Sequence, residues 1–235
     1  MMKMYILLLS EAFLDENFSS GTAIGLRDVE SCSCYCSSES AALLRERLSD
    51  IPLDALHWID TGDYHYLSLF FLERIGEPFE LILADNHPDD QPSAFAGDGM
   101  LSCGSWVKDA RGLPNLQSFK WLDGQGELQG DNADSPLPVY LSLDLDCLDE
   151  AEFKTDWNQG SMRCDELVGK LENLVAGRRI IGIDICGGIS RAKGAKDCDL
   201  RLNANLRERL ISSLNLLTDR NPEPSSVPHG QDAGR

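Results

Sequence analysis

Short apolar runs alternate with longer amphipathic stretches along this chain. Apolar runs bounded by polar or turn-forming residues predict strands over residues 5–9, 55–59, 79–84, 139–145 and 179–185. Apolar residues at helical spacing predict helices over residues 38–48, 64–75, 163–175 and 200–217. Ser37 or Ser38 suits the N-cap of the first of these helices. Strands separated by helices need crossover connections, so the pattern predicts an α/β fold with a mainly parallel central sheet and helices on both faces.

Two stretches interrupt this alternation. Residues 113–138 are rich in Gly, Asp, Asn and Pro, and we interpret them as a surface excursion with one edge strand at 118–122. Residues 221–235 contain few apolar side chains and are predicted to form a disordered tail. The chain has 235 residues, a length that favours a single α/β domain over residues 1–220.

Charge and hydropathy narrow the class of protein. The net charge of -18 argues against a nucleic-acid partner, because phosphate binding needs a basic surface. The apolar run at residues 5–9 is too short for a secretory signal, and no segment is long enough to span a bilayer. We therefore expect a cytoplasmic protein without a membrane partner, and an assembly of identical chains is left open.

Eight cysteines occur, and in the cytoplasm they are expected to stay reduced. Cys32, Cys34 and Cys36 lack the two-residue gap that is usual in zinc knuckles. Their spacing would let them face one way on an extended segment, as buried or half-buried thiols. A redox or active-site role is the alternative.

Histidines and carboxylates gather at predicted strand ends. Asp85 follows the strand at 79–84, and the carboxyl end of a parallel strand is where such sheets bind ligands. Asp85, His87 and Asp89 alternate, so in an extended segment their side chains would share a direction. Asp144 and Asp146 repeat the arrangement at the end of the strand at 139–145.

Such carboxylates are costly to bury unless cations compensate them, so the pattern predicts a metal site. The predicted ligands are His65, Asp85, His87, Asp89, Asp144 and Asp146. Oxygen-rich ligands with one imidazole per ion suit Mn²⁺, Fe²⁺, Co²⁺ or Zn²⁺ better than Ca²⁺, and the absence of cysteine weakens the case for zinc. Each piece alone has another explanation, since an Asp-x-Asp can be a turn or cap and His65 can be a packed side chain.

The motifs resemble those of a known family. Asp85-x-His87-x-Asp89 and Ser142-x-Asp144-x-Asp146-x-x-Asp149 are similar to the two signature motifs of the ureohydrolase superfamily, which includes arginase, agmatinase and formimidoylglutamase. The segment 61–65 resembles the family's Gly-Gly-Asp-His with Tyr64 as an extra residue, and the segment 182–185 resembles a later strand. The resemblance spans about residues 55 to 190.

The resemblance implies a three-layer arginase-like α/β/α fold with two divalent metal ions, expected to be manganese, with zinc, iron or cobalt as alternatives. It implies that Asp85 and Asp144 bridge the ions, that His65 and Asp89 complete one ion, and that His87 and Asp146 complete the other. A metal-bridging hydroxide, oriented by Asp89, would then attack an sp² carbon of a small-molecule substrate.

Two departures from the family pattern concern the substrate. Cys103 stands where arginases carry a histidine proton shuttle, so Cys103 is a candidate catalytic residue. The sequence has Cys186-Gly187-Gly188 where the family places a guanidinium-binding glutamate. That carboxylate is therefore missing, unless an acid of the loop at 150–156 replaces it: Glu150, Glu152 or Asp156.

These motifs and departures leave three possible functions. The first is hydrolysis of a non-peptide C–N bond in a small guanidino, formimino or amide compound. The second is an inactive family member that keeps its metals. The third is a zinc-dependent deacetylase-like amidohydrolase, which is weaker because no tandem histidines occur.

Overall fold

An eight-stranded sheet forms the centre of the molecule. The structure, a computed structural model, describes residues 2–18, 20–92, 100–131 and 135–220. The strand order is β2-β1-β4-β10-β9-β5-β7-β8, and all neighbours run parallel except β7 and β8. The strands are β1 (Lys3–Leu8), β2 (Thr22–Gly25), β4 (Ala55–Ile59), β5 (Phe79–Ala84), β7 (Leu116–Leu122), β8 (Leu128–Gly130), β9 (Val139–Asp144) and β10 (Ile180–Cys186).

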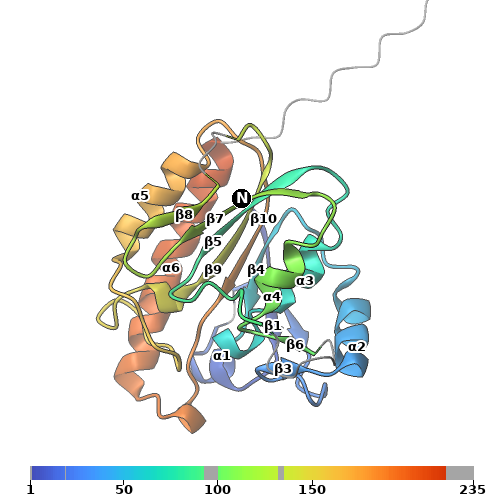
Figure 1. Ribbon diagram of the computed structural model, residues 1–235. Helices are drawn as coiled ribbons and strands as arrows, with labels where there is room; N and C mark the ends of the chain where they lie inside the picture. Colours follow the sequence, from blue (N-terminus) through green and yellow to red (C-terminus); the bar gives the residue numbers. More distant parts are fainter. Residues whose placement is uncertain (1, 19, 93–99, 132–134, 221–235) are drawn as a thin grey trace, which may run out of the picture.

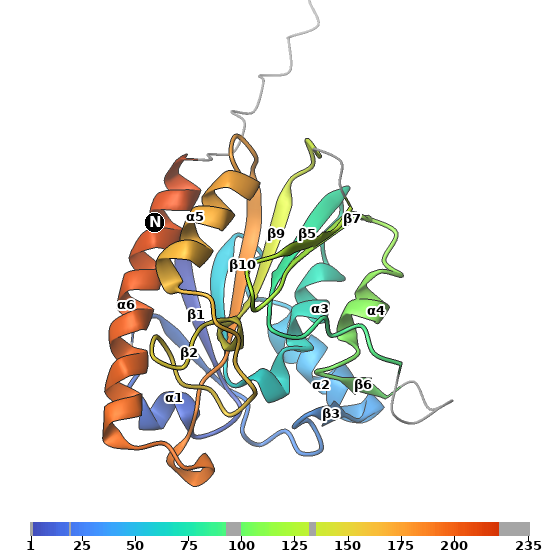
Figure 2. The ribbon, with the colours of Figure 1, turned by 60° about the vertical axis from the view of Figure 1, so that its left-hand side comes forward.

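Helices cover both faces of this sheet (Figures 1 and 2). One face carries α2 (Ser38–Leu48), α3 (Leu67–Leu72) and α4 (Trp106–Ala110). The other face carries α5 (Cys164–Leu174) and α6 (Asp197–Arg220), with the short α1 (Ala12–Asp15) at one end. The predicted three-layer α/β/α fold with a mainly parallel sheet is confirmed.

Residues of β5 show how the strands build two cores. All six residues of β5 are buried. Leu81 and Leu83 belong to the apolar cluster beneath α2, α3 and α4, whereas Ile82 and Ala84 belong to the cluster beneath α5 and α6. Successive side chains of a strand point to opposite faces, so a strand covered on both sides must be apolar throughout. This requirement is why continuous apolar runs located the central strands.

Most predicted elements coincide with observed ones, but two predicted helices differ in extent. The helix predicted over 200–217 is longer, since α6 extends three residues beyond each predicted end. The strands at 55–59 and 79–84 and the helix at 38–48 match their predicted bounds. Ser37 is the N-cap, and its Oγ accepts a hydrogen bond from the backbone N–H of Ser40 at 3.1 Å. The helix predicted over 64–75 is shorter: a 3₁₀ turn, η1 (Gly62–Tyr64), precedes α3. The His65 N–H bonds the Gly62 carbonyl at 3.1 Å, which is the tighter 3₁₀ pairing.

The predicted edge strand is also corrected. β7 lies between β5 and β8, so the strand at 118–122 is not at the edge. The edge strand on this side of the sheet is β8, whose three residues are all exposed and therefore carry no alternation of apolar and polar positions. Gly126, at φ +80°, lies in the turn that joins the two strands. The single domain over 1–220 stays a prediction, and the tail at 221–235 lies outside the described residues.

A second sheet of two short strands brings the cysteine-rich segment against the loop after residue 100. β3 (Tyr35–Cys36) pairs antiparallel with β6 (Leu101–Ser102). Cys32 and Cys36 are buried and Cys34 is half-buried, as expected, but Cys34 has a φ of +57°. This left-handed residue interrupts the extended chain, so the expectation that the three thiols face one way is wrong.

None of the helices in the described part of the chain combines the length and the apolar character needed to cross a bilayer.

Candidate metal centre

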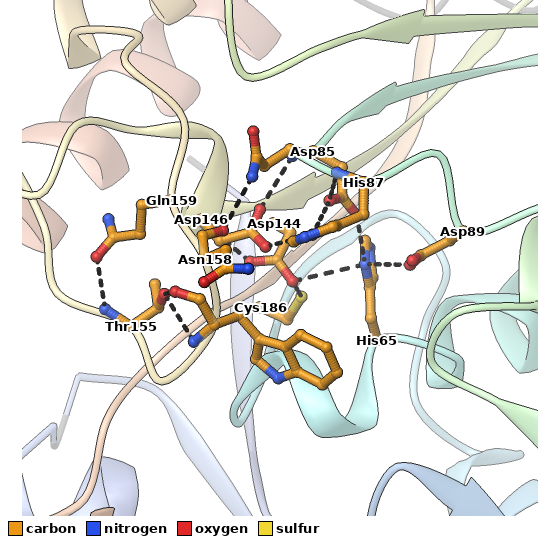
Figure 3. Close-up of polar contacts among 12 residues, drawn as sticks. His65, Asp85, His87, Asp89, Asp144, Asp146, Thr155, Asn158, Gln159 and Cys186 are labelled. Carbon is orange, nitrogen blue, oxygen red and sulfur yellow. Dashed lines mark hydrogen bonds and ion pairs between the residues drawn. The ribbon is translucent and has the colours of Figure 1, made fainter. Parts of the chain in front are cut away.

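The candidate ligands gather at the carboxyl ends of four adjacent central strands (Figure 3). Asp85 follows β5 directly and Asp144 is the last residue of β9. His65 follows η1 after β4, and Cys186 ends β10 opposite Asp144 in the strand register. Because β4, β10, β9 and β5 are neighbours and parallel, these ends meet at one edge of the sheet.

Asp85 lies between the two histidines. Its Oδ2 is 3.1 Å from His65 Nδ1, and its Oδ1 is 3.6 Å from His87 Nδ1. Asp89 Oδ2 also approaches His65 Nδ1, at 3.2 Å, and Asp146 Oδ2 approaches His87 Nδ1, at 2.9 Å. Two sets of three ligand atoms result, and within each set all atoms lie within 4.8 Å of one another. The two sets have Asp85 in common.

Asp144, at the end of β9, lies beside Cys186 at the end of β10. Its Oδ2 is 3.7 Å from His65 Nδ1 and accepts a hydrogen bond from the Cys186 thiol at 2.9 Å. Its Oδ1 accepts a hydrogen bond from the backbone N–H of Asp146 at 2.9 Å. A third set of ligand atoms comes from His65, Asp144 and Cys186, so a thiol borders the centre that the sequence predicted to consist of histidine and carboxylate alone.

The hydrogen bonds of His65 test whether a cation fits. Its Nε2 lies 2.9 Å from Ser142 Oγ, which in turn lies 3.0 Å from Ser68 Oγ. This contact fits an Nε2–H donor and directs Nδ1 at the carboxylates, where the buried Nδ1 has no hydrogen-bond partner. Buried polar atoms are normally satisfied. A divalent cation between Nδ1 and the oxygens of Asp85 and Asp89 would satisfy all three groups, so the donor set fits a metal.

The protonation of the cluster supports the same conclusion. Burial, and then repulsion from Asp146 and Asp85, raises the pKa of Asp144, and burial with repulsion from Asp85 raises the pKa of Asp146. Hydrogen bonds to Asp146 and Asp85 raise the pKa of His87 to about 10. Without a cation the cluster therefore retains protons, which a bound divalent ion would displace.

Turns, rather than extended backbone, orient two of the carboxylates. Asp89 has a φ of +46°, and the indole Nε1–H of Trp106 donates to its Oδ2 at 2.8 Å. Asp146 lies in a 3₁₀ turn, η2 (Leu145–Cys147), and its Oδ1 accepts from the backbone N–H of Asn86 at 3.0 Å. Asp85, His87 and Asp89 all line one cavity, but not through the regular extended backbone that the alternation assumed: His87 faces Asp146 while Asp89 faces His65.

A cavity of about 240 Å³ opens onto the cluster. Besides candidate ligands it is lined by Cys34, Tyr35, Gly62, Gln91, Pro92, Ser102, Cys103, Gly104 and Trp157. Cys103 thus borders the cavity, with 8% of its surface exposed, and burial raises its pKa. Its thiol is therefore protonated at neutral pH.

The loop acids proposed as replacements for the missing glutamate lie elsewhere. Glu150 pairs with Lys154 at 2.7 Å, and Glu152 pairs with Arg163 at 2.8 Å. Asp156 faces Lys193 at 3.6 Å. Among the described residues that line the cavity, the carboxylates are those of the candidate ligands alone.

The backbone after β10 leaves little room for a side chain at Gly187. It has a φ of +99°, and a Cβ there would lie 3.0 Å from Asp144 Oδ1. The chain thus passes close behind the cluster in a conformation that favours glycine.

Trp157 and Cys34 are lining residues that the sequence did not assign to the site. The ring of Trp157 meets that of His87 edge-on at 6.0 Å between centroids, and its Nε1–H donates to Asp63 Oδ1 at 3.0 Å. For Cys34 the only signal was the repeated cysteine spacing, which does not specify which thiol faces the cavity.

Comparison with known proteins places this geometry in context. No protein-family model matches the sequence. An uncharacterised protein of Thermotoga maritima is 29% identical over 143 residues, which cover 55% of this chain and 56% of that protein. The chain therefore matches little more than half of this relative's length.

Solved structures match over nearly the whole chain. Proclavaminate amidino hydrolase from Streptomyces clavuligerus has a TM-score of 0.60 at 14% identity, covering 94% of this chain and 92% of its own. Arginase from Entamoeba histolytica, in complex with L-ornithine, has a TM-score of 0.60 at 11% identity, covering 91% and 97%. Formimidoylglutamase from Bacillus subtilis has a TM-score of 0.59 at 13% identity, covering 91% and 87%. At these identities the chain shares with the arginase-like ureohydrolases their fold.

Proposed function

We propose that this protein is a divergent ureohydrolase: a binuclear-metal hydrolase of a non-peptide C–N bond in a small guanidino, formimino or amide compound. The observation that carries the proposal is the placement of Asp85. Its two oxygens face different histidines, at 3.1 Å from His65 Nδ1 and 3.6 Å from His87 Nδ1. A carboxylate that offers one oxygen to each of two imidazoles is arranged to bridge two ions.

The six predicted ligands would hold the ions. Asp85 and Asp144 would bridge them, His65 and Asp89 would complete one site, and His87 and Asp146 the other. We propose manganese, with zinc, iron or cobalt as alternatives. Bound there, such ions would make water a stronger nucleophile and would stabilise the charge that develops on the heteroatoms bonded to the reacting carbon.

The chain's own groups would position the reactants and move protons. Asp89, held by the Trp106 indole, would orient the attacking water and accept its proton. The protonated thiol of Cys103 borders the cavity and would donate a proton to the leaving nitrogen. Trp157 would cover the substrate from the side of His87. The cavity of about 240 Å³ suits a small substrate. We propose that the protein acts in the cytoplasm.

Two alternatives differ in measurable ways. A zinc-dependent deacetylase-like enzyme would need one ion, whereas the two ligand sets that share Asp85 favour two. An inactive protein would bind both ions and turn over nothing. Because the guanidinium-binding glutamate is missing, an active enzyme could still fail to hydrolyse arginine or agmatine. Tests with those two substrates alone therefore do not distinguish an active hydrolase from an inactive protein.

The deciding experiment joins metal analysis to a substrate screen. Purified protein loaded with Mn²⁺ is expected to hold two ions per chain by elemental analysis. It is then incubated with guanidino, formimino and amide compounds, and released urea, formamide or ammonia is measured. Asp85→Ala serves as the matched inactive control. One tightly bound zinc would favour the deacetylase, two ions without turnover would favour the inactive protein, and no metal would refute all three.

A further inference from the structure

The pairing of β3 with β6 sets two cysteines opposite each other in the wall of the cavity. Tyr35 pairs with Ser102 and Cys36 with Leu101 in this antiparallel ladder. Cys34 lies just outside β3, and the register continued by one residue would set it against Cys103. The Cys103 N–H donates to the Cys34 carbonyl at 2.9 Å, which holds the two residues together. Both side chains line the cavity.

This placement is compatible with a disulfide. Residues directly opposite in an antiparallel pair have Cα atoms about 4.5–5.5 Å apart. Disulfides span Cα separations of about 4.4–6.8 Å, so the backbone need not move far. Each thiol also shifts the pKa of the other, as neighbouring thiols do. Cys103 belongs to the same apolar cluster as Cys32 and Cys36, and Cys34 packs against that cluster from the cavity side.

The backbone at Cys34 is held in an uncommon conformation. Its φ of +57° is unfavourable for a residue with a side chain and persists only where the surroundings enforce it. Here the conformation turns Cys34 toward the cavity while its neighbours Cys32 and Cys36 remain buried. Cys34 is also half-buried, whereas Cys103 is buried, so a reagent in the cavity reaches Cys34 more readily.

We propose that Cys34 and Cys103 form a reversible disulfide, a redox modification site in the wall of the cavity. A low-molecular-weight disulfide is the oxidant. Burial raises the pKa of Cys34 to about 11, so its thiol first gives its proton to water and then attacks the oxidant, which releases one thiol. Cys103, deprotonated in the same way, attacks the resulting mixed disulfide and releases the second thiol. The two cysteines lose two electrons and two protons, and the oxidant is reduced to two thiols. One consequence rests on the proposed function: Cys103 within the disulfide has no proton to donate to a leaving group.

Mass spectrometry of the full-length protein tests the bond without any activity measurement. The protein is equilibrated with oxidised glutathione, free thiols are alkylated under denaturing conditions, and the chain is cleaved with trypsin without reduction. Cys103 is the one cysteine of the tryptic peptide 75–108, whereas peptide 28–45 holds Cys32, Cys34 and Cys36. We expect these two peptides to be linked, and dithiothreitol to separate them.

Variants assign the link within peptide 28–45. The double variant Cys32→Ser/Cys36→Ser should keep the link, and Cys34→Ser should lose it, with thermal unfolding used to check that each variant folds. The exposed Cys198 reports in the same sample that the oxidant acted. Modified Cys198 together with fully alkylated Cys103 in the native sequence would overturn the proposal, as would a link from Cys103 to Cys32 or Cys36. A link that forms in protein without hydrolysis in the reduced state would leave the disulfide intact and count against the proposed function instead.

Discussion

The thiol of Cys186 donates a hydrogen bond to Asp144, with 2.9 Å between Sγ and Oδ2. Both residues end neighbouring strands, and Cys186 is fully buried. The carboxylate proposed to bridge two metals is thus oriented by a weak donor that sits beside it in the sheet. Hydrogen bonds of this kind to ligating carboxylates commonly tune metal affinity.

Replacement of Cys186 should therefore change metal binding selectively. We expect Cys186→Ala to weaken Mn²⁺ binding on the order of 10-fold, because Asp144 loses the donor that fixes its orientation. Cys186→Ser supplies a hydroxyl donor of similar size and should stay close to the native affinity. Isothermal titration calorimetry measures both. Equal losses in the two variants would show that packing, and not the hydrogen bond, matters.

Replacement of a carboxylate that bridges both ions should remove more metal than replacement of a carboxylate that binds one ion. Asp85→Ala or Asp144→Ala is expected to remove both ions, whereas Asp146→Ala should chiefly weaken one site. Metal content per chain by elemental analysis measures this. Asp165→Ala, at an exposed carboxylate distant from the cluster, is the matched control and should retain both ions. Full occupancy in Asp85→Ala or Asp144→Ala would refute the bridging assignment.

The sequence located this cluster well but did not reveal its geometry. Apolar runs placed Asp85 and Asp144 at strand ends because a strand covered on both faces must be apolar throughout. The direction of Asp89 could not be predicted in the same way, because its φ of +46° is stabilised by tertiary contacts such as the Trp106 indole. The role of Cys34 was hidden for a similar reason, since its place in the cavity depends on the pairing of β3 with β6.

The metal-free protein should lose stability as the pH rises. Asp144, Asp146 and His87 all have pKa values raised in the folded chain, so the folded state binds more protons than the unfolded state. The stability they contribute is present at acidic pH and is lost between the ordinary carboxyl range and about 10, the pKa of His87. Thermal unfolding of chelator-treated protein at about pH 6 and about pH 9 measures the effect.

Added Mn²⁺ should reverse this trend. Metal binding needs deprotonated ligands, so its stabilising effect grows as the pH rises. The difference in Tm between metal-loaded and metal-free protein is therefore expected to be larger at about pH 9 than at about pH 6. A difference that is constant with pH would show that the cluster does not exchange protons for metal.

A buried ion pair far from the predicted motifs should contribute strongly to stability. Arg207 of α6 pairs with Glu16 after α1, and both side chains are buried. Glu16 Oε1 also accepts a hydrogen bond from Asn203 Nδ2 at 2.9 Å, and the guanidinium lies 4.1 Å from the Phe18 ring centroid. Arg207→Ala would leave the Glu16 carboxylate uncompensated, at a cost of about 3–5 kcal/mol in the free energy of unfolding.

The matched control for Arg207 is an arginine in an exposed pair. Arg27 bonds Glu11 through Nη1 at 2.6 Å, with 47% of its side chain exposed, so Arg27→Ala should cost less than about 1 kcal/mol. Urea unfolding of both variants measures the two costs. Glu16→Gln/Arg207→Met, which removes both charges but keeps side-chain volume, should recover much of the loss, because no unpaired charge then stays buried. A double variant as unstable as Arg207→Ala would show that packing of Arg207 against the aromatic rings, rather than compensation of Glu16, holds α6 to the sheet.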